Sequence, residues 1–383
     1  MESARSPAPL DGLLVLDLSR VLAGPYCTMT LADLGARVIK VEHPEGGDIT
    51  RGWGPPYSPS GNSAYYESIN RNKESIVLDL ATEPGRRSVE RLARRADVLI
   101  ENFPPGGLAR LGLSLERMRA ENPRLVTASI TGFGEAGPDR DAPGFDLLAQ
   151  AGAGLMAITG EPDGPPQKVG VAVSDLVAGA NAAIGILAAL AARERTGRGT
   201  AVSIDLFSST LAMLVNVVQS CIVSGREAGR HGSGHAQIVP YQMFSAADGE
   251  WILAAGTERQ FRTLCERVVE RPEWAKDPRF SSNAVRVQNR RALVEGLAAI
   301  FAGRPREEWI ARCRAAGVPA GPVRGPLEAL ASEQARALGL RMKDGDFETV
   351  ASPIRIAGGR AAARRPPRLG EHTEAIRKEF GLD

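Results

Sequence analysis

Short apolar runs alternate with amphipathic stretches over the first 130 residues, and this alternation constrains the fold more than any other feature of the chain. It is typical of a mostly parallel sheet covered by helices. We expect strands at Leu13–Leu18, Ala36–Val41, Ser75–Leu80, Asp97–Glu101 and Leu125–Ile130, and helices at Gly24–Leu34, Glu83–Arg95 and Leu115–Glu121. The sequence therefore predicts a doubly wound α/β domain.

The rest of the chain predicts more helices and then a second, smaller domain. After a loop rich in glycine and proline, helices are expected at Asp146–Met156, Leu176–Glu194 and Asp205–Val223. An abrupt shift to glycine, arginine and histidine at Gly225–Gly234 predicts a domain boundary. Beyond it we expect a hairpin of Tyr241–Ala246 with Trp251–Ala255, helices at Arg259–Val269, Arg290–Ala302 and Arg306–Ala315, strands at Phe347–Val350 and Ile354–Ala357, and a terminal helix.

Charge and cysteine content narrow the classes of partner. The chain has 47 basic and 45 acidic residues, and a net charge of +2 gives no field that favours nucleic acid or a lipid surface. Its cysteines, Cys27, Cys221, Cys265 and Cys313, lie far apart without the spacing of a metal site. Leu176–Ala192 is interrupted by glycine and asparagine and falls short of a membrane span of about 20 residues. With no secretory signal in residues 1–9, we expect a cytoplasmic protein that acts on a small molecule and binds no metal.

The first loop after a strand, Ser19–Tyr26, lies where doubly wound folds bind ligands. Glu42 follows about 20 residues later, as a ribose-binding acid would. However, a single Gly24 followed by proline does not supply the GxGxxG fingerprint. This argues against a nicotinamide dehydrogenase.

The loop after the fourth expected strand offers a second ligand surface. Asn102 and Phe103 could present a polar face and a stacking face, and Arg110 lies one turn away for a phosphate. A simple turn is the alternative interpretation of this segment. The aromatic residues Trp53, Tyr57, Tyr65 and Tyr66 are interpreted as packing residues, with a pocket wall as the alternative.

Asp175 stands directly before the most apolar helix of the chain. Helix capping is one interpretation of such a residue. The other is a carboxylate that the helix dipole and free backbone N–H groups keep ionised, and that attacks a thioester carbonyl. The glycine-rich segment His231–His235 is a candidate for the loop that stabilises the oxyanion, or else a flexible connector.

A series of ordered segments matches the motifs of one known family. They are Ser19–Tyr26, Leu34–Glu42, Gly47–Arg51, Asn70–Lys73, Asp97–Phe103 with Arg110–Gly112, Thr131–Gly134, Gly144–Asp146, Gly170–Asp175 and Ile238–Gln242, with a weaker match at Gly317–Pro322. On these residues the chain resembles the class III CoA-transferases, the family that includes formyl-CoA transferase, carnitine CoA-transferase and α-methylacyl-CoA racemase.

The resemblance implies a role for each matching residue. Asp175 would be the catalytic aspartate, which forms a mixed anhydride with the acyl group and then a thioester with CoA. Gly232 and Gly234 would belong to a glycine loop over the active site. The positions that contact CoA in the family are Val21, Leu22, Ala23, Asn72, Lys73, Asn102, Phe103 and Arg110 in this chain. The family's glutamine is replaced by Leu22, so the polar role of that position has no group to perform it here.

The resemblance also implies an assembly that periodicity does not reveal. Two subunits would interlock as rings in a homodimer, with both chains contributing to the active site. Residues 1–224 would form the Rossmann-like large domain, 225–324 the smaller α+β domain, and 325–383 a segment that returns to the large domain. CoA would enter as a substrate, with no tightly bound cofactor.

One position separates two activities within the family. In the racemase branch a histidine precedes the aspartate of the Gly-x-Asp motif, whereas Phe145 here cannot shuttle a proton. The segments Ser233–Gln242, Gly256–Phe261 and Arg286–Arg290 resemble the succinate–hydroxymethylglutarate CoA-transferases. We therefore expect CoA transfer from succinyl-CoA or another dicarboxylyl-CoA to a carboxylic acid, with a racemase or a non-catalytic CoA-binding protein as the alternatives.

Overall fold

The computed structural model describes residues 8–356 and 362–382. Its contacts divide the chain into two compact units, which we describe separately. Unit 1 consists of three segments: the residues up to Leu155, Lys168–Arg226, and the residues from Glu333 onwards. Unit 2 consists of Met156–Gln167 and Glu227–Ser332. The first of these two segments was not expected to leave the large domain.

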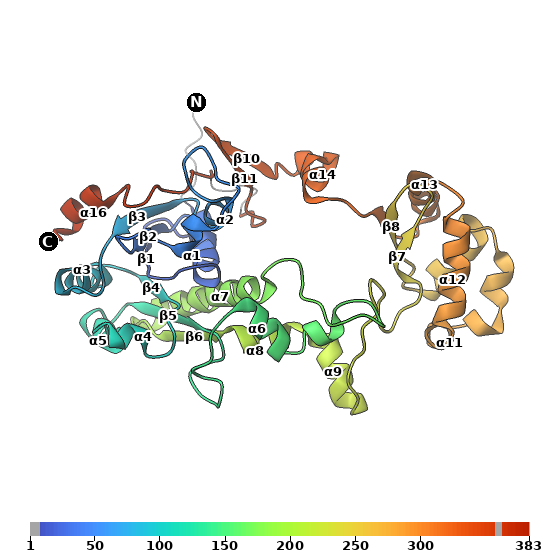
Figure 1. Cartoon of the computed structure of the whole chain (residues 1–383), viewed down its shortest axis with the longest axis horizontal. Helices are drawn as coiled ribbons and strands as arrows, with labels where there is room; N and C mark the ends of the chain where they lie inside the picture. Colours follow the sequence, from blue (N-terminus) through green and yellow to red (C-terminus); the bar gives the residue numbers. More distant parts are fainter. Residues whose placement is uncertain (1–7, 357–361, 383) are drawn as a thin grey trace. The chain divides into compact units, whose positions relative to one another are not determined.

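Unit 1 is built on a parallel sheet of six strands in the order β3-β2-β1-β4-β5-β6 (Figure 1). The strands are β1 (Leu14–Asp17), β2 (Arg37–Glu42), β3 (Lys73–Val77), β4 (Val98–Glu101), β5 (Val126–Thr131) and β6 (Ala201–Asp205). The chain adds strands to one side of β1 up to β3 and to the other side from β4 onwards, so the switch point lies between β1 and β4. Ligands of such sheets bind at the carboxyl ends of the strands near this point. The predicted α/β fold with a parallel sheet is confirmed.

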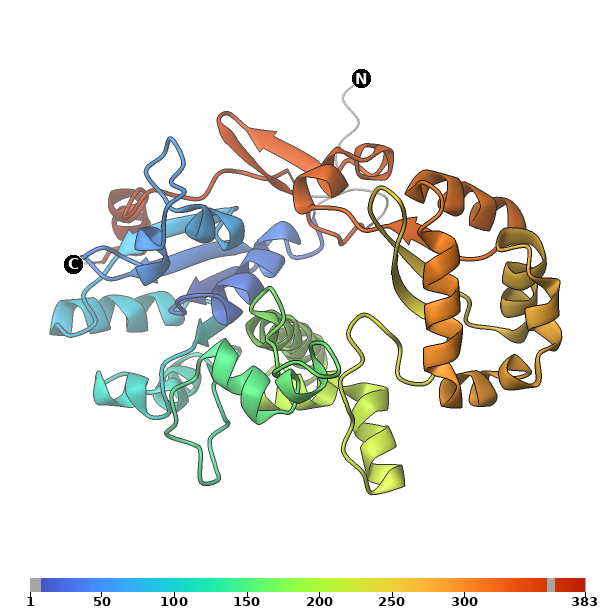
Figure 2. The same ribbon diagram turned by 45° about the vertical axis from the view of Figure 1, so that its right-hand side comes forward.

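Successive strand residues face opposite sides of the sheet, and helices cover both sides (Figures 1 and 2). One core contains Val15 and Val38 and is closed by α1 (Ala23–Asp33), α6 (Asp146–Gly152) and α7 (Val173–Thr196). The other contains Leu16 and Ile39. It is closed by α3 (Glu83–Ala93), α4 (Gly107–Arg110), α5 (Leu115–Glu121) and the terminal helix α16 (Thr373–Phe380).

Two elements of unit 1 differ from the sequence prediction. Strand β6 was missed, although Val202 and Ile204 alternate with polar residues as strand residues do. The single helix expected at Asp205–Val223 is two helices, α8 (Leu206–Met213) and α9 (Val215–Ser224), which are bent by 75° at Leu214 and Val215. The positive φ of 41° at Val215 breaks the helical path.

Helix α7 is longer than the sequence predicted. With 24 residues it has the length and composition of a membrane span, so the expectation that the segment is too short was wrong. Here it packs against α1, β5 and β6, and small buried residues such as Ala178 and Ala182 allow that close packing. The cytoplasmic location stays a prediction.

The other elements of unit 1 are short. They are the 3₁₀ helix η1 (Ile49–Gly52), α2 (Ala64–Ile69), α15 (Glu333–Ala337) and the hairpin β10 (Arg341–Asp344) with β11 (Phe347–Val350). The 3₁₀ helix η2 (Met156–Ile158) belongs to unit 2. The hairpin confirms the strand expected at Phe347–Val350. No named strand forms at residues 354–356 of the strand expected at Ile354–Ala357, and Ala357 lies outside the described residues.

Unit 2 combines a small antiparallel sheet with helices around its own core. Strands β7 (Tyr241–Ser245), β8 (Glu250–Ala254) and β9 (Ala320–Pro322) pair in that order; β7 and β8 form the predicted hairpin, and β9 was not predicted. The helices are α10 (Glu258–Thr263), the π-helix η3 (Leu264–Val268), η4 (Pro272–Lys276), η5 (Pro278–Phe280), α11 (Asn283–Gln288), α12 (Arg290–Phe301), α13 (Arg306–Ala316) and α14 (Pro326–Ala331). Trp251, Phe244, Phe301 and Trp309 form an aromatic centre within the core.

Candidate active site

Asp175 lies in the first turn of α7, one side of which packs on the sheet. The helix begins at Val173 with Ala172 as its N-cap residue, and no side chain of that residue caps it. The interpretation of Asp175 as a cap is therefore wrong. Its carboxylate is partly buried and accepts no hydrogen bond within residues 8–356 and 362–382.

A second carboxylate takes the place at the helix terminus that was expected for Asp175. Asp146 Oδ1 accepts the backbone N–H of Ser174 at 2.8 Å and that of Asp175 at 3.4 Å. Gln150 Nε2 donates to Asp146 Oδ2 at 2.7 Å and holds this carboxylate in place. The first N–H groups of α7 are thus occupied, and they do not stabilise the Asp175 carboxylate.

The protonation of Asp175 follows from these surroundings. Burial and the nearby negative charge of Asp146 raise the pKa of Asp175 to about 7. The expectation that the helix terminus keeps this group fully ionised at neutral pH is corrected accordingly. A raised pKa near the working pH is a property that catalytic carboxylates share.

Asp175 shares a helix face with Gly179, where α7 touches α1. A Cβ atom at Gly179 would lie 2.4 Å from the carbonyl oxygen of Ala23 and 3.2 Å from the Tyr26 ring. Only a glycine allows this approach. The turn that precedes α1 and the N-terminus of α7 are thereby brought together, and both belong to the predicted site.

The turn before α1 joins the loop after β4. Arg20 donates its backbone N–H to Asn102 Oδ1 at 2.8 Å, and Asn102 Nδ2 donates to the Arg20 carbonyl at 2.7 Å. The Arg20 guanidinium stacks on the Phe103 ring at 4.8 Å. Val21 has a φ of 69°, which is unusual for a β-branched residue.

A hollow of about 420 Å³ opens at the carboxyl ends of β1, β2 and β4. Its walls include Phe103, Pro104 and the cations Arg20 and Arg110. The Arg110 side chain is exposed and, among the residues that the structure describes, donates only to the Pro105 carbonyl. This is the edge of the sheet where the fold places ligands, and it combines a ring face with two positive charges.

Four of the predicted CoA contacts are buried: the apolar Leu22 and Ala23, and the polar Asn72 and Lys73. Lys73 is buried, and Nζ donates to Asn70 at 2.8 Å, Pro25 at 3.0 Å and Asp17 at 3.2 Å. Asn72 is also buried and bonds to Asp33 and to the backbone of Arg364. Their contact with CoA stays a prediction, and their observed bonds hold β3 and the return segment in place.

Tyr65 is one of the aromatic residues that were interpreted as packing residues, and it lies in the field of the Asp175 carboxylate. Burial raises its pKa to about 12, and Asp175, Asp146 and Asp48 add to the effect. Its hydroxyl is therefore a neutral donor in the field of the Asp175 carboxylate. Trp53 packs edge-on against its ring at 5.0 Å. The aromatic spacing alone could not distinguish this residue from Tyr66, which is completely buried.

The glycine-rich segment is a tight turn within unit 2. Gly234 donates its N–H to His231 at 2.8 Å, and Gly232 donates to Gly160 at 3.0 Å. Gly232 has a φ of 55°, and a Cβ atom there would lie 2.8 Å from Glu161 Oε2. The positive φ favours glycine here, whereas the contact is with the end of a flexible side chain. Asp175 belongs to unit 1, so the role of the turn at the active site stays a prediction.

The comparison with known proteins decides the family. The sequence model of CoA-transferase family III matches residues 10–373. The chain belongs to CoA-transferase family III. This family III CoA-transferase is 42% identical to the succinate–glutarate CoA-transferase of Agrobacterium fabrum over 97% of the chain and 96% of the relative. It is 41% identical to the acetyl-CoA:oxalate CoA-transferase of Acetobacter aceti over 98% of the chain and 97% of the relative. It is 40% identical to the mouse succinyl-CoA:glutarate CoA-transferase over 98% of the chain and 87% of the relative.

Solved structures of relatives share the fold of this CoA-transferase. A CaiB/BaiF family protein from Brucella suis is 42% identical and superposes with a TM-score of 0.88 over 98% of the chain and 100% of the relative. Rv3272 from Mycobacterium tuberculosis is 31% identical, with a TM-score of 0.86 over 97% and 100%. The enzyme class and the use of CoA thioesters as substrates follow from the family.

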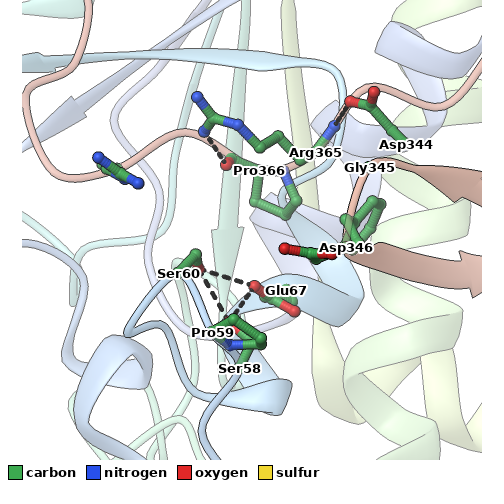
Figure 3. Close-up of a pocket in the computed structure, with 11 residues that line it drawn as sticks. Ser58, Pro59, Ser60, Glu67, Asp344, Gly345, Asp346, Arg365 and Pro366 are labelled. Carbon is green, nitrogen blue, oxygen red and sulfur yellow. Dashed lines mark hydrogen bonds between the residues drawn. The ribbon is translucent and has the colours of Figure 1, made fainter.

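A second hollow in unit 1 of the CoA-transferase has a volume of about 320 Å³ (Figure 3). The segments that line it do not include Asp175 or its neighbours in the sequence. Ser58 and Ser60 both bond to Glu67, and Arg365 donates its N–H to Asp344. Several of its polar groups thus bond to one another. Across the described parts of the chain, no group of three His, Cys, Asp or Glu residues is placed to hold a metal ion.

Proposed function

We propose that this enzyme moves CoA between dicarboxylic acids through a covalent intermediate on Asp175. The observation that carries the proposal is a carboxylate without a hydrogen-bond donor, with a pKa raised to about 7, beside the turn that precedes α1. A carboxylate that accepts no hydrogen bond and is partly removed from water is more nucleophilic than one held by N–H groups. Its placement at a ligand-binding edge of the sheet gives it access to a substrate.

The reaction proceeds in two halves that mirror each other. An Asp175 carboxylate oxygen attacks the thioester carbonyl carbon of the donor, the C–S bond breaks, and CoA leaves as the thiolate while a mixed anhydride remains. The thiolate then attacks the Asp175 carbonyl carbon and releases the donor acid as a carboxylate, leaving an aspartyl-CoA thioester. The acceptor carboxylate then attacks the carbonyl carbon of that thioester and displaces CoA as the thiolate, which leaves a mixed anhydride of Asp175 and the acceptor. The thiolate attacks the acceptor's carbonyl carbon in this anhydride and forms the new acyl-CoA. Asp175 is regenerated as a carboxylate.

Asp146 favours this chemistry through charge. Burial and, to a smaller extent, repulsion from the Asp146 carboxylate raise the pKa of Asp175, so both destabilise its charged form in the free enzyme. Acylation of Asp175 removes one of the two charges and with it the repulsion. The neutral Tyr65 hydroxyl is a candidate donor to the oxyanion that develops on the carbonyl.

The hollow at the ends of β1, β2 and β4 fits the nucleotide part of CoA. The Phe103 ring offers a surface on which an adenine can stack, and Arg20 and Arg110 offer positive charge to phosphates. Val21, Leu22 and Ala23 then lie between this hollow and α7, on the path of the pantetheine arm. Lys73 and Asn72 support the site from inside.

The substrate class rests on the relatives. The names of two of the similar enzymes pair succinate with glutarate, and the third pairs oxalate, also a dicarboxylic acid, with acetyl-CoA as the donor. We infer succinyl-CoA or a related dicarboxylyl-CoA as the donor. A screen of CoA donors and acceptors tests this, because inert succinyl-CoA and C4–C6 diacids beside an active monocarboxylate would refute the assignment.

The alternative activity within the family is racemisation at the α-carbon. Phe145, the residue before Asp146, has no group that exchanges a proton, and this favours transfer. A racemase would exchange the α-hydrogen of an acyl-CoA with deuterated water in the absence of an acceptor. A non-catalytic CoA-binding protein would bind CoA without turnover.

The proposal includes a homodimer. Helix α9 has an apolar composition but no buried residue, and Val215, Ile222 and Val223 are 65%, 68% and 78% exposed. Exposed apolar surfaces of this kind mark association sites. An interlocked partner subunit would cover them.

Replacement of Asp175 tests the mechanism directly. Asp175→Asn and Asp175→Ala should abolish CoA transfer and leave CoA binding and the thermal unfolding midpoint close to those of the wild type, because the residue caps no helix. Asp139→Asn, in an exposed loop, is the matched control and should keep full activity. Transfer at the wild-type rate in either Asp175 variant would rule out the covalent carboxylate.

A further inference from the structure

The backbone of the turn before α1 is held almost entirely by side chains from other elements. Asp17 Oδ1 accepts the Ser19 N–H at 2.9 Å, and Lys40 Nζ donates to the Ser19 carbonyl at 2.8 Å. Asn102 bonds both backbone groups of Arg20. The strands β1 and β2 and the loop after β4 each supply one of these side chains. Such an arrangement fixes the turn from several sides at once.

The last bond of the set is made to a strained residue. The Val21 N–H points to the Asp48 carboxylate, with distances of 3.3 and 3.4 Å to its two oxygens. Val21 has a φ of 69°, a backbone conformation that β-branched residues rarely adopt. Strain of this kind persists only where the surrounding structure imposes it. Asp48 is the group in position to impose it.

Asp48 is itself fixed by a buried cation. Lys40 Nζ lies 2.9 Å from Asp48 Oδ2, and both side chains are completely buried. The backbone N–H and the hydroxyl of Thr50 also donate to Asp48 Oδ1, at 3.0 and 2.8 Å. A buried ion pair adds little net stability compared with apolar packing, so its presence here calls for a role in specifying a conformation.

We propose that Asp48, held by Lys40, is a positioning residue that keeps Val21 in its left-handed conformation and so presents the turn Ser19–Ala23 to the acyl-CoA. The inference rests on the proposed function for its ligand. The Ala23 carbonyl lies against Gly179, one helical turn from Asp175, so a shift of the turn changes the surface next to the nucleophile. Asp48 touches no substrate in this account.

Substitutions in two backgrounds test the inference. In the wild type, Asp48→Asn should raise KM for succinyl-CoA about tenfold and change kcat less than about threefold, because the thioester is misplaced rather than the chemistry altered. In a Val21→Gly background, glycine adopts a positive φ without strain, and the same substitution should raise KM less than about threefold. Each KM is compared with that of its own background.

Asp97→Asn is the matched control. Asp97 likewise accepts a backbone N–H, from Leu14 at 2.9 Å, and pairs with a buried cation, Arg193 at 3.0 Å. It lies at the amino end of β4, whereas the turn lies at the carboxyl ends of the strands. Its replacement should leave KM unchanged. Equal increases of KM by Asp48→Asn in both backgrounds, or an equal increase by Asp97→Asn, would overturn the inference.

A second variant and a second measurement keep the inference testable if Asp48→Asn does not fold or if the enzyme has no transferase activity. Lys40→Met with Asp48→Leu removes both buried charges and retains their approximate volume, so the chain should fold. Hydrogen exchange of the peptide containing Val21 should be faster in this variant and in Asp48→Asn than in the wild type. Unchanged exchange would overturn the inference even if the protein proved to have no transferase activity, whereas a wild type that transfers no CoA would refute the proposed function alone.

Discussion

The carbonyl oxygen of Ala23 lies 2.4 Å from the place where a Cβ atom of residue 179 would stand, so Gly179 allows α7 to touch the start of α1. We predict that Gly179→Ala separates the two helices, lowers the free energy of unfolding by about 1–3 kcal/mol and greatly reduces transferase activity. Thermal or urea unfolding and an activity assay measure the two effects. Gly321→Ala, which meets no heavy atom within 4 Å, should be tolerated. Equal behaviour of the two variants would contradict the prediction.

The pH dependence of the reaction should report the ionisation of Asp175. With a pKa raised to about 7, the nucleophile is protonated at lower pH, so activity is present above this pKa and is lost as the pH falls through it. We predict that kcat/KM for the donor falls about tenfold per pH unit below the inflection. Asp146→Asn removes the like charge and should move the inflection to lower pH. An inflection near pH 4 in the wild type would refute this assignment. So would an inflection that Asp146→Asn leaves in place.

Arg110 should act on the nucleotide end of the substrate. Arg110→Ala removes an exposed cation of the hollow at the strand ends and should raise KM for acyl-CoA about tenfold with little change in kcat. With an acyl-pantetheine substrate, which lacks the nucleotide, the variant and the wild type should behave alike. Arg117→Ala, an exposed arginine of α5, serves as control. A loss of activity that is the same for both substrates would argue against a nucleotide site here.

The apolar surface of α9 should be the place where subunits meet. Ile222→Asp together with Val223→Asp introduces charge where we propose that a partner subunit packs, and should shift a dimer towards monomers. Light scattering coupled to size-exclusion chromatography measures the mass. Leu327→Asp, which changes an equally exposed apolar residue of α14, should leave the mass unchanged. A wild type that is monomeric at micromolar concentration would contradict the proposed assembly.

Most of the fold was predictable because its elements carry local signals. Strands such as Val98–Glu101 are short apolar runs, and α3 has a clear amphipathic period. Strand β6 was missed because its residues are only half-buried or exposed, so it lacks the continuous apolar run of the predicted strands. The break at Val215 was missed because an apolar stretch continues through it without glycine or proline. Tertiary contacts, not local sequence, decide such features.

The candidate site was predictable in its residues but not in its electrostatics. The sequence identified Asp175 but could not show that Asp146, from another helix, occupies the N-terminus of α7 and raises the pKa of its neighbour. Nor could it show that Lys73 has no free donor, since its three acceptors come from separate segments. Contacts that form only in the folded chain determine both properties.

A trapping experiment tests the central claim most directly. Enzyme that is turning over succinyl-CoA is treated with hydroxylamine, which attacks activated acyl groups, and its peptides are analysed by mass spectrometry. The account predicts a hydroxamate on the peptide containing Asp175, formed only in the presence of donor and absent from Asp175→Asn. A modification at another residue, or none while CoA transfer continues, would contradict it.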